Sequence, residues 1–201
     1  LVTETIVVDN GSTDDTGNIA ENHGATVLLE NRKGYGFSCL RGMDYLNSKA
    51  KPDDIIIFLD GDYSDFPEEI SMLINPIIHS GYQMVIGSRV LGEHQSGSLL
   101  PQQIAGNWLA TKLMELFFNA KFTDLGPFRA IRWNALKKIN MQDKTFGWTV
   151  EMQIKAAKNK LRCTEVPVSY RKRIGKSKVS GTIKGTFMAG YKILLTIFKY
   201  I

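Results

Sequence analysis

The strongest constraint on the fold is a run of five apolar residues, Ile55 to Leu59, that leads directly into Asp60-Gly61-Asp62. The run is short, rich in β-branched side chains and not interrupted by polar residues, which is typical of a buried strand in a parallel sheet. Open α/β sheets bind their ligands at the carboxyl ends of their strands. The two acids therefore stand where such a sheet would place a ligand.

Two carboxylates one residue apart repel each other unless a cation lies between them. Hard divalent cations take oxygen ligands and often share them with phosphate groups. Asp60 and Asp62 are thus candidate ligands of a metal ion that also holds a diphosphate. The alternative is an acidic turn with both side chains in water, and the motif alone does not decide between the two.

Strand and helix patterns alternate along the first half of the chain. The strand patterns lie at residues 5–9, 25–29, 55–60 and 83–87, and the helix patterns lie at 12–23, at 34–47 and from Pro67 onward. Ser12 or Thr13 is the expected cap of the first helix. Pro67, followed by two glutamates, is a favourable helix start. This order predicts an α/β fold with a doubly wound, mostly parallel sheet.

The second half of the chain has longer helices. A Gly- and Ser-containing stretch at 91–100 reads as a mobile loop, and the elements expected after it are a helix at 101–118, a strand at 128–132, a helix at 148–159, a strand at 164–168 and a helix at 182–201. The helix at 101–118 carries an apolar stripe of Ile104, Trp108, Leu109, Leu113, Leu116 and Phe117. Near-helical spacing predicts that this stripe packs in the core, and an acceptor groove is the alternative.

Basic residues are concentrated toward the C-terminal end. Residues 152–201 contain twelve Lys or Arg and one acid, whereas residues 1–151 contain thirteen basic and nineteen acidic residues. This asymmetry suggests that the region faces an anionic partner, and nucleic acid, a lipid phosphate and an anionic membrane surface are the candidates. A solvated basic face is the alternative and is the commoner case for a basic run alone. No nucleic-acid motif is present, so nucleic acid is not expected. Two cysteines and no apolar run of 18 residues predict a reducing compartment and no spanning segment.

Several short motifs follow one another along nearly the whole chain. They are Val7-Val8-Asp9-Asn10-Gly11-Ser12-Thr13-Asp14-Asp15-Thr16, Asn31-Arg32-Lys33-Gly34-Tyr35-Gly36, Asp60-Gly61-Asp62, Pro67-Glu68-Glu69-Ile70, Ile86-Gly87-Ser88-Arg89, the stretch 124–129, and Glu165-Val166-Pro167 followed by Gly175-Lys176-Ser177-Lys178. In this order they resemble the motifs of the inverting family 2 glycosyltransferases, and the branch they resemble most is the polyprenyl (dolichyl) phosphate mannose or glucose synthases. Each motif is weak alone, and the series in register is specific.

The resemblance implies a GT-A, Rossmann-like three-layer αβα sandwich over residues 1–180, followed by an amphipathic, membrane-interfacial helix at 181–201. It implies a hexosyltransferase that uses GDP-mannose or UDP-glucose and a divalent cation, Mg²⁺ or Mn²⁺, held by Asp60 and Asp62. The residues it assigns to the donor are Asp9, Asn10, Gly11, Ser12, Lys33, Gly34, Asp60, Gly61, Asp62 and Arg89. An Asx cap for Asp9, a solvated Lys33 and a surface ion pair for Arg89 are the structural alternatives.

The acceptor decides whether a general base is needed. A sugar hydroxyl requires one, and Asp124 is the best candidate. A polyprenyl phosphate requires none, because its second pKa lies near about 6 and it is mostly dianionic at neutral pH. It needs cations instead, and the candidates are Arg129, Arg171, Arg173, Lys176 and Lys178, with Ser177 beside them. Arg129 has a structural alternative, an ion pair with a nearby acid such as Asp124.

The chain departs from the family pattern at four places. The first family strand and its PxxNE segment are absent, which predicts an incomplete sheet. Asn10 replaces the second aspartate of the usual pair, the stretch 124–129 lacks its serine, and Lys172 replaces an arginine. These changes concern the acceptor more than donor chemistry, so a soluble enzyme with a sugar or phosphoglycerate acceptor is the alternative.

The basic tail and the apolar final helix predict a peripheral protein on the cytoplasmic face of a membrane. Packing of that helix on the sheet or on a second subunit, and a lead into further membrane helices, are the alternatives.

Overall fold

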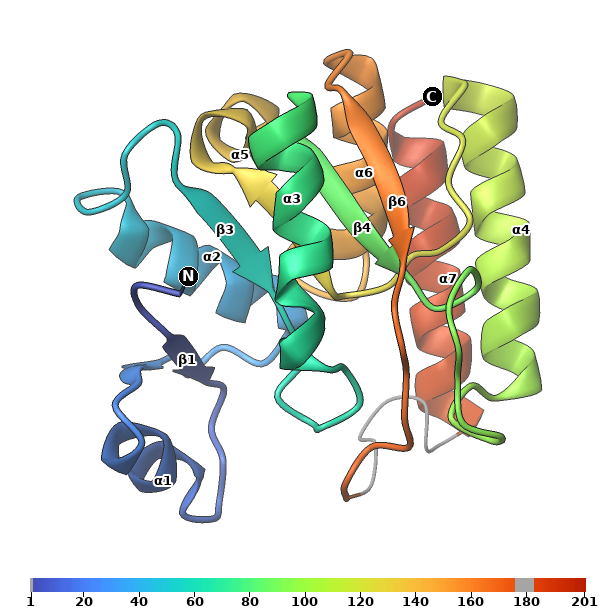
Figure 1. Cartoon of the computed structure of the whole chain (residues 1–201). Coiled ribbons are helices and arrows are strands. Elements are labelled where there is room, and N and C mark those ends of the chain that lie inside the picture. Colours follow the sequence, from blue (N-terminus) through green and yellow to red (C-terminus); the bar gives the residue numbers. More distant parts are fainter. Residues whose placement is uncertain (1, 176–182) are drawn as a thin grey trace. The chain divides into compact units, whose positions relative to one another are not determined.

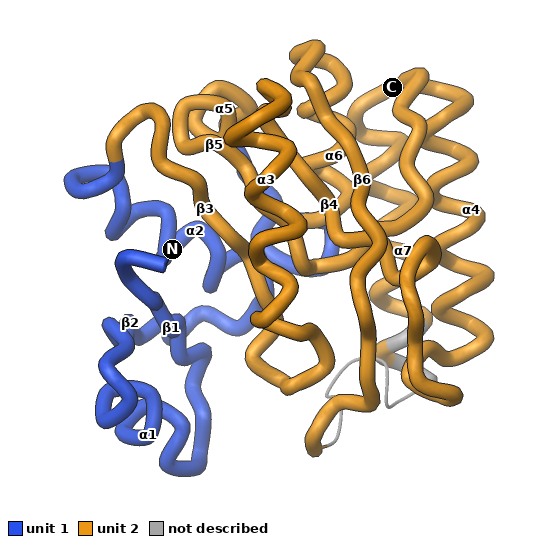
Figure 2. The backbone as a smooth tube through the Cα atoms, viewed as in Figure 1, with its two compact units in different colours: residues 1–50, 141–148 blue, residues 51–140, 149–201 orange. Residues whose placement is uncertain are grey.

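The computed structural model describes residues 2–175 and 183–201, which form two compact units. The first unit comprises residues 1–50 and 141–148, and the second comprises residues 51–140 and 149–201 (Figure 2). Each unit has its own sheet.

The first unit is built on two parallel strands. β1 (Ile6–Asp9) pairs with β2 (Thr26–Leu29), with Ile6 opposite Thr26, and α1 (Thr16–Asn22) connects them. α2 (Tyr35–Leu46) follows β2. The segment 141–148 joins this unit through a hydrogen bond from the Phe37 amide to the Lys144 carbonyl (3.1 Å).

The predicted cap of the first helix is wrong. α1 begins at Thr16, its N-cap residue is Asp15, and Ser12 and Thr13 lie in the preceding turn. The Ser12 amide donates instead to the Asp9 carboxylate (2.7 Å), and the Thr16 amide donates to Asp14 (3.2 Å). The turn is longer than the pattern indicated because two aspartates, rather than the hydroxyl residues, bind the leading amides.

The second unit contains a four-stranded sheet in the order β3-β5-β4-β6. Its strands are β3 (Ile55–Phe58), β4 (Met84–Ser88), β5 (Arg129–Arg132) and β6 (Cys163–Pro167). β4 and β6 are parallel, and β5 lies antiparallel between β3 and β4. Three strands therefore run one way and end at the same edge (Figure 1).

Helices surround this sheet. The short 3₁₀ turn Pro67–Glu69 leads into α3 (Ile70–Ser80), which lies in front of the strands in Figure 1. The other helices are α4 (Pro101–Phe118), α5 (Trp133–Ile139), α6 (Trp148–Lys158) and α7 (Ile183–Lys199). Leu73 and Ile77 of α3 pack on Val85 and Ala130 of the sheet, while Met114, Ile154 and Ile197 of α4, α6 and α7 form a second core.

The predicted burial of the α4 stripe is wrong. Ile104, Trp108, Leu109, Leu116 and Phe117 are exposed, and only Leu113 of the stripe packs against the core. The buried side of α4 is formed by Ala110, Thr111 and Met114. Apolar side chains lie on most sides of this helix, so their spacing did not identify the buried one. Within the described residues, no helix combines the length and hydropathy needed to cross a bilayer.

Candidate functional site

Asp60-Gly61-Asp62 follows β3 at the edge where the three parallel strands end. One Asp62 carboxylate oxygen accepts hydrogen bonds from the amide (3.0 Å) and the hydroxyl of Ser64. The other carboxylate oxygen lies 3.1 Å from a guanidinium nitrogen of Arg173. A cation supplied by the chain itself therefore stands on the carboxylate predicted to hold a metal ion.

Arg173 belongs to the segment after β6, residues 169–175, which runs along the Asp60-Gly61-Asp62 loop. The Arg171 amide donates to the Ser64 carbonyl (3.0 Å), and the Ile174 amide donates to the Asp62 carbonyl (2.9 Å). On its other side this segment binds the loop at 91–100, because the Gln95 amide donates to the Tyr170 carbonyl (2.9 Å). The loop expected to be mobile is thus attached by hydrogen bonds to the segment after β6.

Arg171, a predicted phosphate ligand, is held by the same loop. Its guanidinium carbon lies 3.2 Å from the centroid of the Tyr63 ring and 4.2 Å from that of Phe66. It also donates to the carbonyls of Tyr63 and Asp65. Tyr63 has a positive φ of 70°, a conformation that is costly for a bulky residue and needs support from its surroundings. Arg171 supplies such support, so its interactions are those of a positioning residue.

Asp65 is a member of this loop that the sequence motifs did not single out. It is 2% exposed, and one of its oxygens has no hydrogen-bond partner among the described residues. Burial, together with the nearby charge of Asp60, raises the pKa of Asp65 to about 7. The sequence does show Asp65 as a third acid, three residues after Asp62, and this spacing is the signal that could have identified it.

The loop fits a divalent cation in its donor chemistry, because its carboxylate oxygens are hard ligands and a buried carboxylate oxygen lacks a partner. Within residues 2–175 and 183–201, no three His, Cys, Asp or Glu side chains are arranged to hold a metal ion by themselves. Asp60 and Asp62 would therefore share such an ion with oxygens of a bound phosphate or with water.

Asp124 and Arg89 form a buried ion pair at the same edge. The Arg89 amide and Nε donate to one Asp124 oxygen (2.8 and 2.7 Å), and Nη2 donates to the other (2.7 Å). Asp124 is 1% exposed. Burial opposes its charge, but the hydrogen bonds from Arg89 outweigh this effect and lower the pKa of Asp124. Arg89 therefore forms a buried ion pair, whereas the predicted structural alternative was an ion pair at the surface.

Asp124, the acid named as an example for the structural alternative of Arg129, pairs with Arg89 instead. Arg129 is 1% exposed, and its guanidinium donates to the main-chain carbonyls of Gly126 and Thr149 (3.1 Å each). Burial among carbonyls does not present it to an acceptor phosphate. The predicted phosphate role of Arg129 has no support in this structure.

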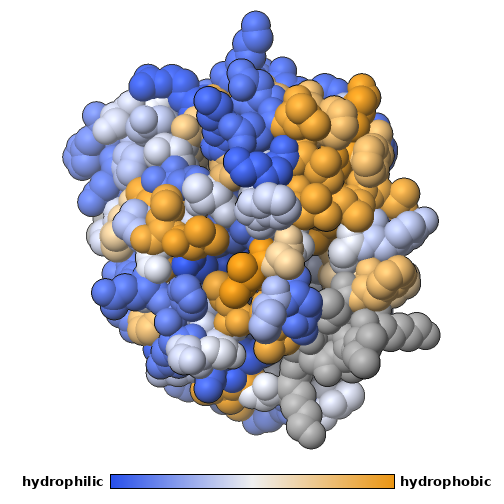
Figure 3. Space-filling view, turned by 90° about the vertical axis from the view of Figure 1, so that its right-hand side faces the viewer, coloured by the Kyte–Doolittle hydropathy of each residue, from blue (hydrophilic) through white to orange (hydrophobic). Residues whose placement is uncertain are grey.

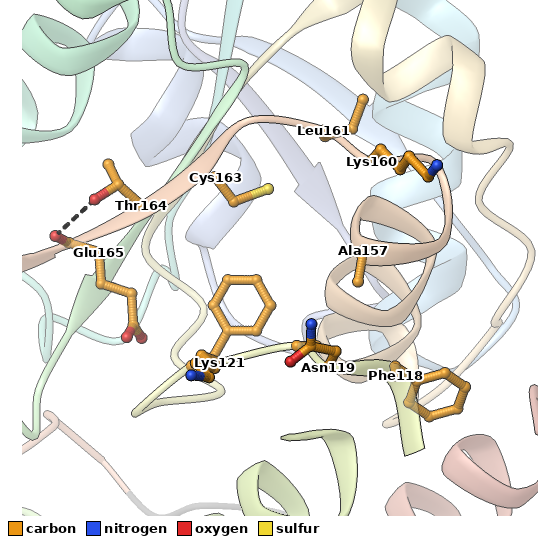
Figure 4. A pocket seen from close by; sticks show the side chains of 11 residues that line it. Phe118, Asn119, Lys121, Ala157, Lys160, Leu161, Cys163, Thr164 and Glu165 are labelled. Atoms are coloured by element: carbon orange, nitrogen blue, oxygen red, sulfur yellow. Dashed lines mark hydrogen bonds between the residues drawn. The ribbon is translucent and has the colours of Figure 1, made fainter. Parts of the chain in front are cut away.

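Glu165 fixes the backbone that carries Asp124. Its carboxylate accepts the amide of Thr123 (2.8 Å) and that of Asp124 (3.2 Å), and burial raises the pKa of Glu165. The sequence showed Glu165 only as part of a family motif. It also lines an open cavity of about 650 Å³ with Cys163, Lys121 and Lys160 (Figure 4), and that cavity includes none of the predicted site residues.

The predicted donor residues of the first unit come together around Asn10. Its side-chain amide donates to the carbonyls of Glu30 and Arg32 (2.7 Å each) and accepts the Gly34 amide (3.0 Å). The Lys33 ammonium donates to the carbonyls of Asn10 and Gly11 (2.8 and 3.0 Å). Lys33 is thus bound rather than merely solvated.

Asp9 accepts the Ser12 amide, which confirms its predicted alternative as an Asx cap and lowers the pKa of Asp9. Lys176, Ser177 and Lys178 lie outside the described residues.

Comparison with known proteins agrees with this arrangement. The profile of glycosyl transferase family 2 matches residues 1–140. An uncharacterized glycosyltransferase of Mycobacterium tuberculosis is 33% identical over 92% of this chain and 81% of its own length. An undecaprenyl-phosphate mannosyltransferase of Micrococcus luteus is 27% identical over 90% of this chain and 78% of its own length.

The fold is also found among solved structures. Glucosyl-3-phosphoglycerate synthase of Mycobacterium tuberculosis, in complex with Mn²⁺, UDP and phosphoglyceric acid, superposes with a TM-score of 0.75 at 19% identity, over 99% of this chain and 68% of that one. This likeness confirms the predicted GT-A type of α/β fold. By the family profile and the mycobacterial relative together, the chain belongs to glycosyl transferase family 2.

Proposed function

We propose that this glycosyltransferase moves a hexose from a nucleotide-diphosphate sugar to a polyprenyl phosphate, at the cytoplasmic face of a membrane. The observation that carries the proposal is the state of Asp124, the predicted general base. Both of its oxygens accept hydrogen bonds from Arg89, and its pKa is lowered. A base in this state is poorly suited to take a proton from a hydroxyl group. A phosphate acceptor is already anionic and needs no base.

Candidate residues for the donor occur in each unit. In the second unit, Asp60 and Asp62 would hold Mg²⁺ or Mn²⁺, which neutralises charge on a departing nucleotide diphosphate. In the first unit, Asp9 and the loop joined by Asn10 and Lys33 would bind the nucleoside part. The Mn²⁺ and UDP bound by the structural relative support this assignment.

Among the residues that the structure describes, Arg173 is the cation best placed to meet a phosphate in this loop. Its side chain is 40% exposed, and Asp62 is its partner. A metal ion on Asp62 would free the guanidinium for an anionic oxygen nearby, and Arg is well suited to phosphate because its planar donors can bind two oxygens.

The test is transfer of label from GDP-mannose or UDP-glucose, with Mn²⁺, to undecaprenyl phosphate or dolichyl phosphate in detergent. We expect a labelled lipid with one of the two donors, its loss with a chelator, and its loss in Asp62→Ala. Absence of labelled lipid with every donor and acceptor would contradict the proposal.

A soluble acceptor is the second candidate, because the structural relative is a glucosyl-3-phosphoglycerate synthase by name. Transfer to a hydroxyl group of phosphoglycerate would need a general base, so the state of Asp124 argues against this candidate. Including 3-phosphoglycerate and free sugars as acceptors in the same assay tests it directly, since a water-soluble labelled product would favour this candidate.

A further inference from the structure

The sides of α4 and α7 that face away from the core form an exposed apolar surface. On α4, Leu116 is 73% and Trp108 is 62% exposed, and on α7, Phe198 is 57% and Tyr191 is 54% exposed. A large hydrophobic area is visible in Figure 3, which looks onto the side of the molecule where these helices lie in Figure 1. Contiguous apolar surface of this kind marks an interaction site.

The two helices present one surface rather than two. Their inner sides share a core that includes Met114 and Ile197, each 0% exposed. On the outer side, the rings of Phe117 and Phe198 lie with their centroids 6.2 Å apart and join the helices near their C-terminal ends. We call this surface the α4–α7 face and define it by Trp108, Leu116, Phe117, Tyr191, Leu195 and Phe198.

The exposed apolar side chains of α7 lie along one side of the helix. Phe187, Tyr191, Leu195 and Phe198 are separated by four, four and three residues, so they lie along one side. All four are between 46% and 74% exposed. The stripe is therefore left uncovered along the length of the helix.

Charge identifies the kind of partner. The sequences of α4 and α7 contain four lysines and one acid, Glu115, which pairs with Lys112 at 2.9 Å. Two copies packed through these helices would bring together two helix pairs that each carry an excess of positive charge. An anionic bilayer would instead attract them while accepting the apolar side chains. Trp108 and Tyr191 are residue types that favour the membrane–water interface.

We propose that the α4–α7 face is the surface on which this chain docks to an anionic lipid bilayer. Both helices begin at the edge of the second unit where the Asp60-Gly61-Asp62 loop lies (Figure 1). Docking would thus place that loop at the membrane surface, where the phosphate of a polyprenyl lipid is found. The biological purpose of the docking rests on the proposed function, but the docking itself can be tested without it.

The experiment is vesicle flotation of the chain, without donor and without polyprenyl phosphate. Vesicles of phosphatidylcholine alone are compared with vesicles containing about one third phosphatidylglycerol. We expect flotation with the anionic vesicles and at least tenfold weaker binding for the double variant Leu116→Ser, Leu195→Ser. The matched control is Met72→Ser, Ile78→Ser on α3, whose side chains are 39% and 50% exposed. It should float like the unaltered chain.

Trp108 reports directly on insertion. The other two tryptophans, Trp133 and Trp148, are 5% and 1% exposed, so a vesicle-induced change in fluorescence would come from Trp108. We expect a blue shift with anionic vesicles, absent in Trp108→Phe although that variant still floats. This readout does not depend on whether a serine variant folds.

Three outcomes would overturn the docking proposal: no flotation of the unaltered chain, equal binding by the double variant and the α3 control, or a dimer in solution that the face variant alone converts to a monomer. Transfer to lipid in detergent without flotation would leave the proposed function standing and refute docking. Flotation without any transfer to lipid would leave docking standing and refute the proposed function.

Discussion

At the scale of single residues, Asp62 has two competing partners: Arg173 in this structure and the divalent cation expected on the same carboxylate. Removing the guanidinium should therefore favour the cation. We expect Arg173→Gln to bind Mn²⁺ several-fold more tightly, measured by electron paramagnetic resonance of free Mn²⁺ without nucleotide. Lys172→Gln removes the same charge one residue away and is the control. Equal Mn²⁺ affinities in the two variants would refute the competition.

The buried ion pair of Asp124 leads to a second prediction at the scale of single residues. Removing one partner of a buried ion pair costs about 3–5 kcal/mol, so Asp124→Asn should lower the free energy of unfolding by roughly that amount at pH 7. The folded-state pKa of Asp124 lies below its ordinary value of 3.8. The stability from the charged form is therefore present above that value and is lost as the pH falls through the folded-state pKa.

Urea unfolding at pH 7, 5 and 3.5 measures this difference. The gap between Asp124→Asn and the unaltered chain should persist to pH 5 and begin to close at pH 3.5. Asp53→Asn is the control, because the Asp53 side chain is 87% exposed beside Arg132 and its loss should cost little. A gap that stays constant at all three pH values would argue against the ion pair as its source.

At the scale of elements, Gly92 shows how closely the chain after β4 approaches the chain after β6. A β-carbon at Gly92 would lie 2.0 Å from the Val168 carbonyl oxygen. We expect Gly92→Ala to destabilise the chain by about 1–3 kcal/mol in thermal unfolding, since main-chain atoms must move. Gly106 on α4 has open space around it, so Gly106→Ala should be neutral or stabilise by up to about 1 kcal/mol. If Gly92→Ala left the thermal stability unchanged, the main chain around Gly92 and Val168 would be able to move apart at little cost.

The elements themselves were largely predictable, and their packing was not. The apolar run at 55–59 predicted β3, and Pro67 predicted the start of the helical segment that becomes α3. The pairing order β3-β5-β4-β6 was not predictable, because the sequence of a strand does not specify which strands pair with it. The buried side of α4 was misjudged because small residues, Ala110 and Thr111, pack where larger ones were expected.

The same limit applies to the site. Sequence motifs singled out Asp60-Gly61-Asp62, Arg89 and the loop at Lys33 as candidates, since short-range spacing carries that information. They did not show which arginine meets which acid. Arg171 stacks on Tyr63, Arg173 meets Asp62 and Arg129 binds carbonyls, although all three are the same residue type. Only the folded chain separates these environments.

At the scale of the whole molecule, charge is distributed unevenly, with twelve basic residues and one acid in residues 152–201. Attraction of such a region to an anionic surface is screened by salt over about 8–10 Å at 0.10–0.15 M. We expect transfer to polyprenyl phosphate in anionic vesicles to fall several-fold in apparent kcat/KM between low and high salt. Transfer in detergent at the same salt concentrations is the control, and an equal fall there would assign the effect to donor binding.

Asn10 has a consequence for any attempt to restore the family pattern in this chain. Its amide gives two hydrogens to the carbonyls of Glu30 and Arg32 while its oxygen receives one from Gly34. The aspartate of the family motif that residues 7–16 resemble is an acceptor only when ionised. Its negatively charged carboxylate would then face the carbonyl oxygens of Glu30 and Arg32, to which it cannot donate. Replacing Asn10 by the aspartate of the family motif would therefore remove the hydrogen bonds that join the end of β1 to the end of β2.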